Sequence, residues 1–225
     1  MATSAAPCHA AVTAAASLAG AVRYTEVVTQ IPAENAELIR RILGKGYLEL
    51  RLTRLAVDEV PELATRVKVE VTESGAAATI EGDGVGPIDA LWGALVGRYA
   101  KEYQSLKTVQ LAGFTVSAAI ESKVRRAGLD AMATVEVAVV NSDGRRFAFA
   151  DTSRSVTVSA ARAVIAVVEY FVNAERAFVT LSHARKDAVA RGRADLVARY
   201  TAELAEVVRS TSYAEIIDTL RKELA

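Results

Sequence analysis

Cysteine and histidine are almost missing from this sequence. Its 225 residues contain one cysteine, Cys8, and two histidines, His9 and His183, which lie far apart in the chain. A disulfide within the chain needs two cysteines, and a zinc centre needs several cysteine or histidine ligands that converge. The composition therefore excludes an internal disulfide and a cysteine-based zinc cluster. We expect a reduced, cytoplasmic setting and no metal or other cofactor.

An excess of charge is also missing. Lys+Arg and Asp+Glu each number 27, and no basic run is interleaved with aromatic residues. Proteins that bind nucleic acid through its phosphates carry a basic patch, so we expect no nucleic-acid partner.

Long hydrophobic runs with a basic flank are absent near the start. The segment from Ala10 to Val22 is mostly alanine and too short to span a bilayer, and no Lys or Arg precedes it. We expect no membrane association and interpret residues 1–30 as an Ala-rich leader. A cleaved targeting segment is the alternative.

The sequence does contain enough apolar residues, 52%, for one folded domain with extensions. The segment from Pro32 to Leu43 predicts a short helix that glycines close. The apolar period then falls to two, which is typical of half-buried antiparallel strands. These alternating residues are Leu48, Leu50 and Leu52, followed by Val67, Val69 and Val71.

The order of predicted elements repeats. Ser74-Gly75 forms a turn into a third strand, residues 76–81, and a glycine-rich loop, residues 82–86, leads into a helix. The second round has an extended segment, 109–120, in which Gly113 suggests a bulge, then an alternating segment, 133–139, a hairpin turn, 141–144, and a helix from about Thr157. We predict an α+β fold with two βββα units, about residues 47–104 and 105–176, inside a domain of residues 31–176.

The C-terminal part, residues 177–225, predicts a helical extension. Gly192 is expected to break it, and residues 212–215 form a capping box for a last helix. An apolar stripe in this part, which includes Leu196, Tyr200 and Leu204, indicates packing within the chain or, alternatively, a subunit contact.

Three separate segments resemble the regulatory domain of α-isopropylmalate synthase. Residues 82–90, Gly-Asp-Gly-Val-Gly-Pro-Ile-Asp-Ala, resemble its Gly-x-Gly-x-Gly-Pro-x-x-Ala segment, and residues 128–131, Gly-Leu-Asp-Ala, its Gly-x-Asp-Ala segment. Residues 155–160 resemble the start of its second helix. The resemblance covers roughly residues 47–176 and implies two βββα units, a homodimer, and feedback binding of a branched-chain amino acid near the dimer interface. Citramalate synthase carries a similar domain with another effector.

An amino-acid effector needs amide donors, acceptors and a small apolar pocket. Glycines let backbone N–H groups approach a carboxylate, and a helix start favours negative charge. Asp83 could accept from the ammonium, and alanines leave room for a branched side chain. The expected effector-binding residues are Gly82, Asp83, Gly84, Gly86, Ile88, Phe114, Asp130, Ala131 and Ala133. Alternatively, the glycines only form a tight strand-to-helix turn, and Asp83, Asp89 and Asp130 are turn and helix-start residues.

The catalytic part of such a synthase is a metal-dependent barrel, which needs about 250 residues and is longer than this chain. The sequence also has no His-x-His pair for the metal. We therefore expect no catalytic residues and a stand-alone regulatory module, homodimeric, that controls a separate catalytic synthase chain in leucine biosynthesis. The alternative is a dimeric scaffold that keeps the fold and binds no effector.

Overall fold

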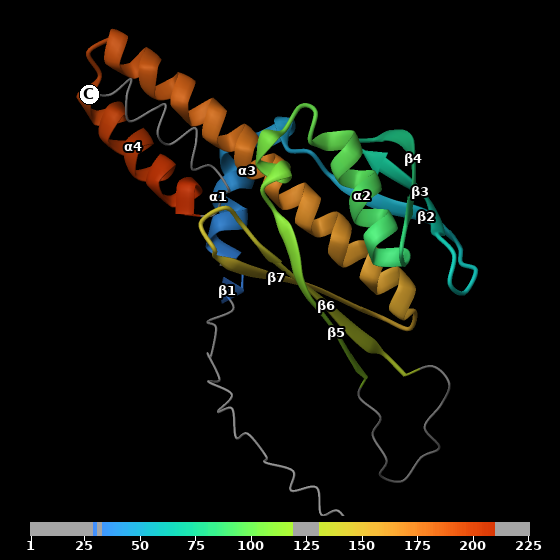
Figure 1. The fold of residues 1–225 in the computed structure, drawn as a ribbon. Helices are drawn as coiled ribbons and strands as arrows, with labels where there is room; N and C mark the ends of the chain where they lie inside the picture. Colours follow the sequence, from blue (N-terminus) through green and yellow to red (C-terminus); the bar gives the residue numbers. More distant parts are fainter. Residues whose placement is uncertain (1–28, 31–32, 119–130, 210–225) are drawn as a thin grey trace, which may run out of the picture.

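The computed structural model describes residues 29–30, 33–118 and 131–209 (Figure 1). The first unit consists of β2 (Leu50–Asp58), β3 (Thr65–Glu73), β4 (Ala76–Gly84) and α2 (Pro87–Tyr99). The second consists of β5 (Gln110–Ala118), β6 (Ala133–Val140), β7 (Arg146–Ser153) and α3 (Val156–Ala190). The predicted α+β fold with two βββα units is confirmed.

Five shorter or flanking elements complete the described chain. β1 (Thr29–Gln30), α1 (Ala33–Leu43) and the 3₁₀ turn η1 (Gly44–Gly46) precede the first unit. A second 3₁₀ turn, η2 (Gln104–Lys107), joins the two units, and α4 (Ala194–Arg209) follows α3.

The first sheet has the order β2-β3-β4, and both pairs are antiparallel. Ser74 and Gly75 have φ values of 49° and 96°, which a two-residue hairpin turn of the I′ type requires. Val67, Val69 and Val71 are at most 1% exposed, so the alternation in the sequence marks the buried face.

The second sheet has the order β1-β7-β6-β5, in which β1 lies parallel to β7 and the other pairs are antiparallel. The register between β5 and β6 shifts between Leu111 and Gly113, so the expected bulge is confirmed. The hairpin turn at residues 141–144 is also confirmed. The Asn141 side-chain oxygen accepts from the backbone N–H of Asp143 and Arg145, and Gly144 has φ 75°.

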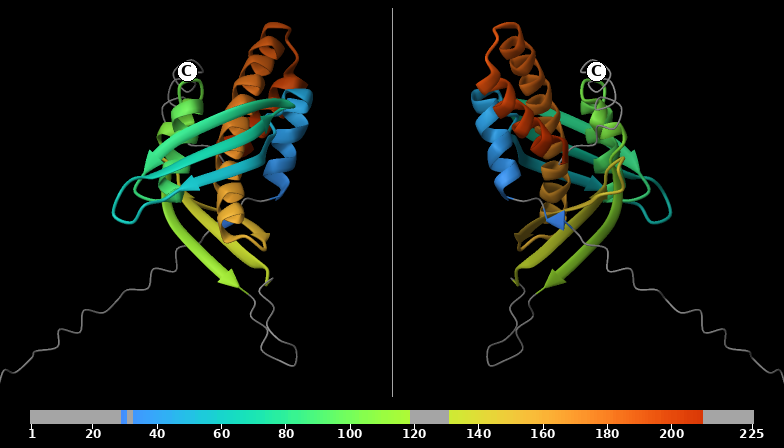
Figure 2. Two further views of the ribbon diagram at one scale, coloured as in Figure 1. Left: turned by 90° about the vertical axis from the view of Figure 1, so that its right-hand side faces the viewer. Right: turned by 90° about the vertical axis from the view of Figure 1, so that its left-hand side faces the viewer.

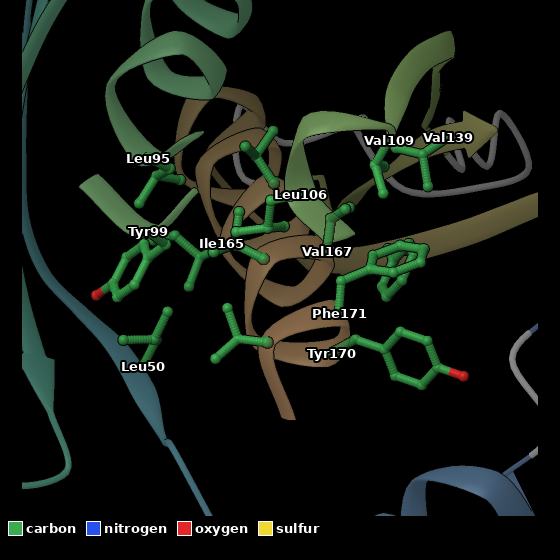
Figure 3. Packing of buried hydrophobic residues seen from close by; sticks show 14 of the residues in the cluster. Leu50, Leu95, Tyr99, Leu106, Val109, Val139, Ile165, Val167, Tyr170 and Phe171 are labelled. Carbon is green, nitrogen blue, oxygen red and sulfur yellow. The ribbon is translucent and has the colours of Figure 1, made fainter. Parts of the chain in front are cut away.

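The core forms around α3, which contacts α2, β2, β6 and β7. Figure 3 shows Leu50, Leu95 and Tyr99 of the first unit on one side of α3, with Val109 and Val139 on the other. Phe171 of α3 meets Phe147 of β7 edge to face, with ring centroids 5.6 Å apart. α3 therefore joins the two units into one core.

By length and composition α3 is able to cross a membrane, but 67% of its most apolar stretch is buried inside this fold. Its apolar residues are those of a core helix.

α3 is continuous through residue 176, where we placed the end of the regulatory domain. Its C-terminal half packs beside α1 and α4, and the views in Figure 2 show these three helices side by side. The break at Gly192, which has φ 65°, separates α3 from α4 as expected. The capping box at residues 212–215 lies outside the described residues.

Candidate functional site

The glycine-rich segment lies where β4 meets α2. Gly82 and Gly84 belong to β4, so our prediction of a loop over residues 82–86 is wrong at these positions. A Cβ atom on Gly82 would lie 2.7 Å from the Cβ of Ala94, and one on Gly84 would lie 2.4 Å from the backbone nitrogen of Ala90. Both contacts are shorter than the sum of atomic radii allows. The two glycines let the backbone of α2 pack directly on β4.

The helix α2 begins immediately after this strand. Gly86 is its N-cap residue with extended backbone, and Pro87 occupies the first turn, where a missing N–H has no cost. The side chain of Asp89 accepts a hydrogen bond from the backbone N–H of Val85, 3.1 Å away. The first-turn amides of a helix have no acceptor within the helix, so this end of α2 favours an anionic ligand.

The aspartates of this region have separate partners. Asp83 accepts from the Nε of Arg66 on β3, at 2.9 Å, and this ion pair raises the pKa of Arg66. Asp89 turns back to Val85. Asp89 therefore has the helix-start role of the alternative interpretation, whereas Asp83 lies within β4 and is neither a turn nor a helix-start residue. Asp130 lies outside the described residues.

The remaining expected site residues lie on different elements. Ile88 is half-buried in the first turn of α2, beside a small cavity that also borders Leu55 and Thr157. Phe114 lies on β5, 46% exposed and opposite Val137. Ala131 is exposed, whereas Ala133 is buried at the start of β6. The structure thus brings Gly82, Asp83, Gly84, Gly86 and Ile88 together, and it places Phe114, Ala131 and Ala133 on the hairpin of the second sheet.

An open groove of about 700 Å³ runs between the free edge of β4 and α2. Gly82 and Asp83 line it, as do four residues of α2 and its end that the sequence analysis did not single out. These are Gly93, Gly97, Arg98 and Lys101. The signal that could have found the two glycines is their Gly-x-x-x-Gly spacing inside a helix, which places both on one face.

A second polar feature missed in the sequence joins α3 to the start of the first sheet. Asn173, 0% exposed, accepts from the backbone N–H of Leu48 and donates to its carbonyl oxygen, both at 2.8 Å. Glu169 accepts from the N–H of Leu50 at 2.8 Å and from the hydroxyl of Tyr47 at 2.9 Å. Burial and the neighbouring Glu169 raise the pKa of Tyr47 to about 12. Glu169 and Asn173 thus occupy the outer edge of β2 where this strand begins.

A family model described as the LeuA allosteric (dimerisation) domain matches residues 31–172. The chain belongs to this family. The match begins just before α1, covers both βββα units of this LeuA-family domain and ends inside α3. No curated protein matches the chain. The chain is thus a regulatory and dimerisation module of the LeuA family.

The LeuA-family domain offers no metal centre among the residues that the structure describes, since no three His, Cys, Asp or Glu side chains converge there.

Proposed function

We propose that this LeuA-family domain is a homodimeric sensor that binds a branched-chain amino acid, or a related small acid, and controls a separate catalytic synthase chain of leucine biosynthesis. The observation that carries the proposal is the family match over both βββα units. The domain acts without a catalytic centre of its own and works in the reduced cytoplasm.

The start of α2 supports the effector chemistry. Its first-turn amides and the positive end of the helix favour the carboxylate of an amino acid. The carboxylates of Asp83 and Asp89 lie within this segment and are the acceptors available to an ammonium group. Ile88, half-buried in the first turn of α2, is the apolar group beside these polar ones, whereas Phe114 and Ala133 lie apart on the second sheet.

Two measurements test the proposal on the native chain. Multi-angle light scattering is expected to give the mass of a dimer at a protein concentration on the order of tens of micromolar, at which a stable dimer stays associated. Titration calorimetry with leucine, isoleucine, valine and the matching 2-oxo acids is expected to give heat for at least one of them. A ligand that binds only the native state also raises the melting temperature.

Two matched variants assign the ammonium contact. Asp83→Asn and Asp89→Asn each remove one carboxylate charge and keep an oxygen acceptor, so the fold is retained. The variant that removes the ammonium partner is expected to lose about tenfold in affinity for the amino acid and little for the 2-oxo acid. Asp143→Asn, in an exposed turn of the other sheet, is the control. Equal affinities in all three variants would contradict the proposed location.

The second candidate function is a dimeric scaffold without an effector, for which the helical part formed by α1, α4 and the end of α3 provides a partner surface. A dimer that gives no heat and no thermal shift with any of the ligands would favour it. Turnover of an acetyl thioester by the purified chain with added divalent metal would contradict both functions.

A further inference from the structure

Among the described elements, β4 is an edge strand with one open side. It pairs with β3 on one side, and no described strand pairs with its other side. Glu73 and Ala76 flank the two-residue turn and form its hydrogen-bonded pair, so the N–H and C=O groups of Ala77, Thr79 and Glu81 point away from β3. The carbonyl oxygen of Glu70, the partner of Thr79, is bonded from the β2 side, which agrees with this alternation. A row of backbone groups therefore faces outward.

The other sheet edges of the described chain differ from this one. On β2, side chains of α3 occupy the outer edge at its start, and the register with β3 shifts between Leu52 and Arg54. β7, which corresponds to β4 in the second unit, is paired on its outer side with β1. β5 carries a bulge, a common device against edge pairing, whereas the register of β4 with β3 has no shift. β4 is thus the straight edge that no described segment covers.

Among the described residues, no close contact requires glycine at Gly93 or Gly97 of α2. A Cβ atom on Gly93 or Gly97 would meet no atom within 4 Å, and glycine inside a helix is less stable than alanine. Both residues border the groove beside the free edge of β4. If the β4 of a second copy paired with this edge, the two β4 strands would lie about 4.8 Å apart. Each α2 packs on its own β4, so the two α2 helices would approach more closely than the usual interaxial distance of about 8–10 Å. Glycines permit that approach.

The charged side chains along the groove do not oppose the pairing of two copies. α2 runs antiparallel to β4, since Gly84 lies against Ala90 and Gly82 against Ala94. Arg98 and Lys101 therefore lie toward the start of β4, and Glu81 and Asp83 lie toward its end. Arg98, Glu81 and Asp83 are paired within the chain, with Glu73, Lys68 and Arg66. A two-fold axis across the edge reverses one copy, so residues of opposite charge, and not of like charge, lie toward each other.

We propose that β4 pairs antiparallel with the β4 of a second copy of this chain, which joins two three-stranded sheets into one of six strands and sets the two α2 helices against each other at Gly93 and Gly97. The proposal rests on the homodimer of the proposed function and names its interface. An axis at Thr79 or Ile80, near the middle of β4, pairs most of the strand, whereas an axis at Glu81 would place two carboxylates opposite each other.

The first test removes one outward N–H. Thr79→Pro deletes an N–H that β3 does not use, and proline is tolerated at the open side of an edge strand. Thr79→Ala changes the same side chain and keeps the N–H. Analytical ultracentrifugation is expected to show a dimer dissociation constant at least about tenfold higher for Thr79→Pro and unchanged for Thr79→Ala. Equal dissociation constants in folded Thr79→Pro and native protein would overturn the proposal.

The second test does not depend on a disruptive change. In a Cys8→Ser background, Thr79→Cys places the only thiol of each copy beside the axis, where a short bismaleimide is expected to link two chains. Thr115→Cys, exposed on the rival edge strand β5, is the matched control and is expected to stay unlinked. Linkage at Thr115→Cys alone would refute pairing through β4 while leaving the homodimer intact. A native chain that is monomeric throughout would refute the proposed homodimer itself.

Discussion

Replacing Gly84 with alanine should break the contact between β4 and α2. The added Cβ would lie 2.4 Å from the backbone nitrogen of Ala90, 2.6 Å from a carboxylate oxygen of Asp89 and 2.8 Å from the Cα of Ala90. Two of these three atoms are backbone, which cannot rotate away. The first turn of α2 must move as a whole, and the buried contacts of Leu91 and Leu95 move with it.

The cost follows from this geometry. Overpacking a well-filled site costs about 1–3 kcal/mol, and a backbone contact belongs at the upper end, about 3 kcal/mol. For a domain of this size each kcal/mol lowers the melting temperature by about 2–4 °C, so we expect a decrease of about 6–12 °C. Because the substitution perturbs the fold, it is not a clean probe of ligand binding at this position.

Urea unfolding and thermal melting of Gly84→Ala measure this loss. The matched control is Gly46→Ala, since a Cβ atom there meets nothing within 4 Å and its φ is not in the left-handed region. The control should stay within about 0.5 kcal/mol of the native chain. A Gly84→Ala protein with the unfolding midpoint of this control would refute the argument that the glycine exists for close packing.

Two further changes test the anchor between α3 and the first sheet. Asn173→Ala leaves the buried N–H and C=O of Leu48 without their partner and should lower the free energy of unfolding by about 2–4 kcal/mol; an unchanged urea midpoint would contradict this role. Tyr47 has a pKa near 12 in the fold and 10.0 as its ordinary value, so its protonated form contributes fully below pH 10 and the contribution is lost as the pH rises toward 12. The stability difference between native and Tyr47→Phe protein, measured by urea unfolding below and inside this window, should shrink at the higher pH; a constant difference would show that Tyr47 does not titrate with folding.

The order of elements could be predicted because local signals carried it. Alternating valines in β3, the Ser74-Gly75 turn and the bulge near Gly113 each depend on residues close in sequence, and the structure confirms all three. The helix break at Gly192 is of the same kind.

The glycines of β4 could not be placed correctly for the opposite reason. Glycine usually signals a loop, but Gly82 and Gly84 are required by the distance to a helix that packs on the strand, and this distance is a tertiary property. The same holds for Glu169 and Asn173. Two polar residues in an apolar helix are visible in the sequence, but their acceptors and donors lie more than a hundred residues earlier.

The continuous helix α3 has a mechanical consequence. Its 35 residues make a rod about 50 Å long, and it contains no proline or glycine at which to kink. One half is fixed between the sheets, and the other carries α1 and α4. A tilt of about 5° at the sheet end displaces the far end by about 4 Å, from the length of the rod. A rearrangement of the β-strands that tilted α3 would therefore reach the helical end as a larger displacement.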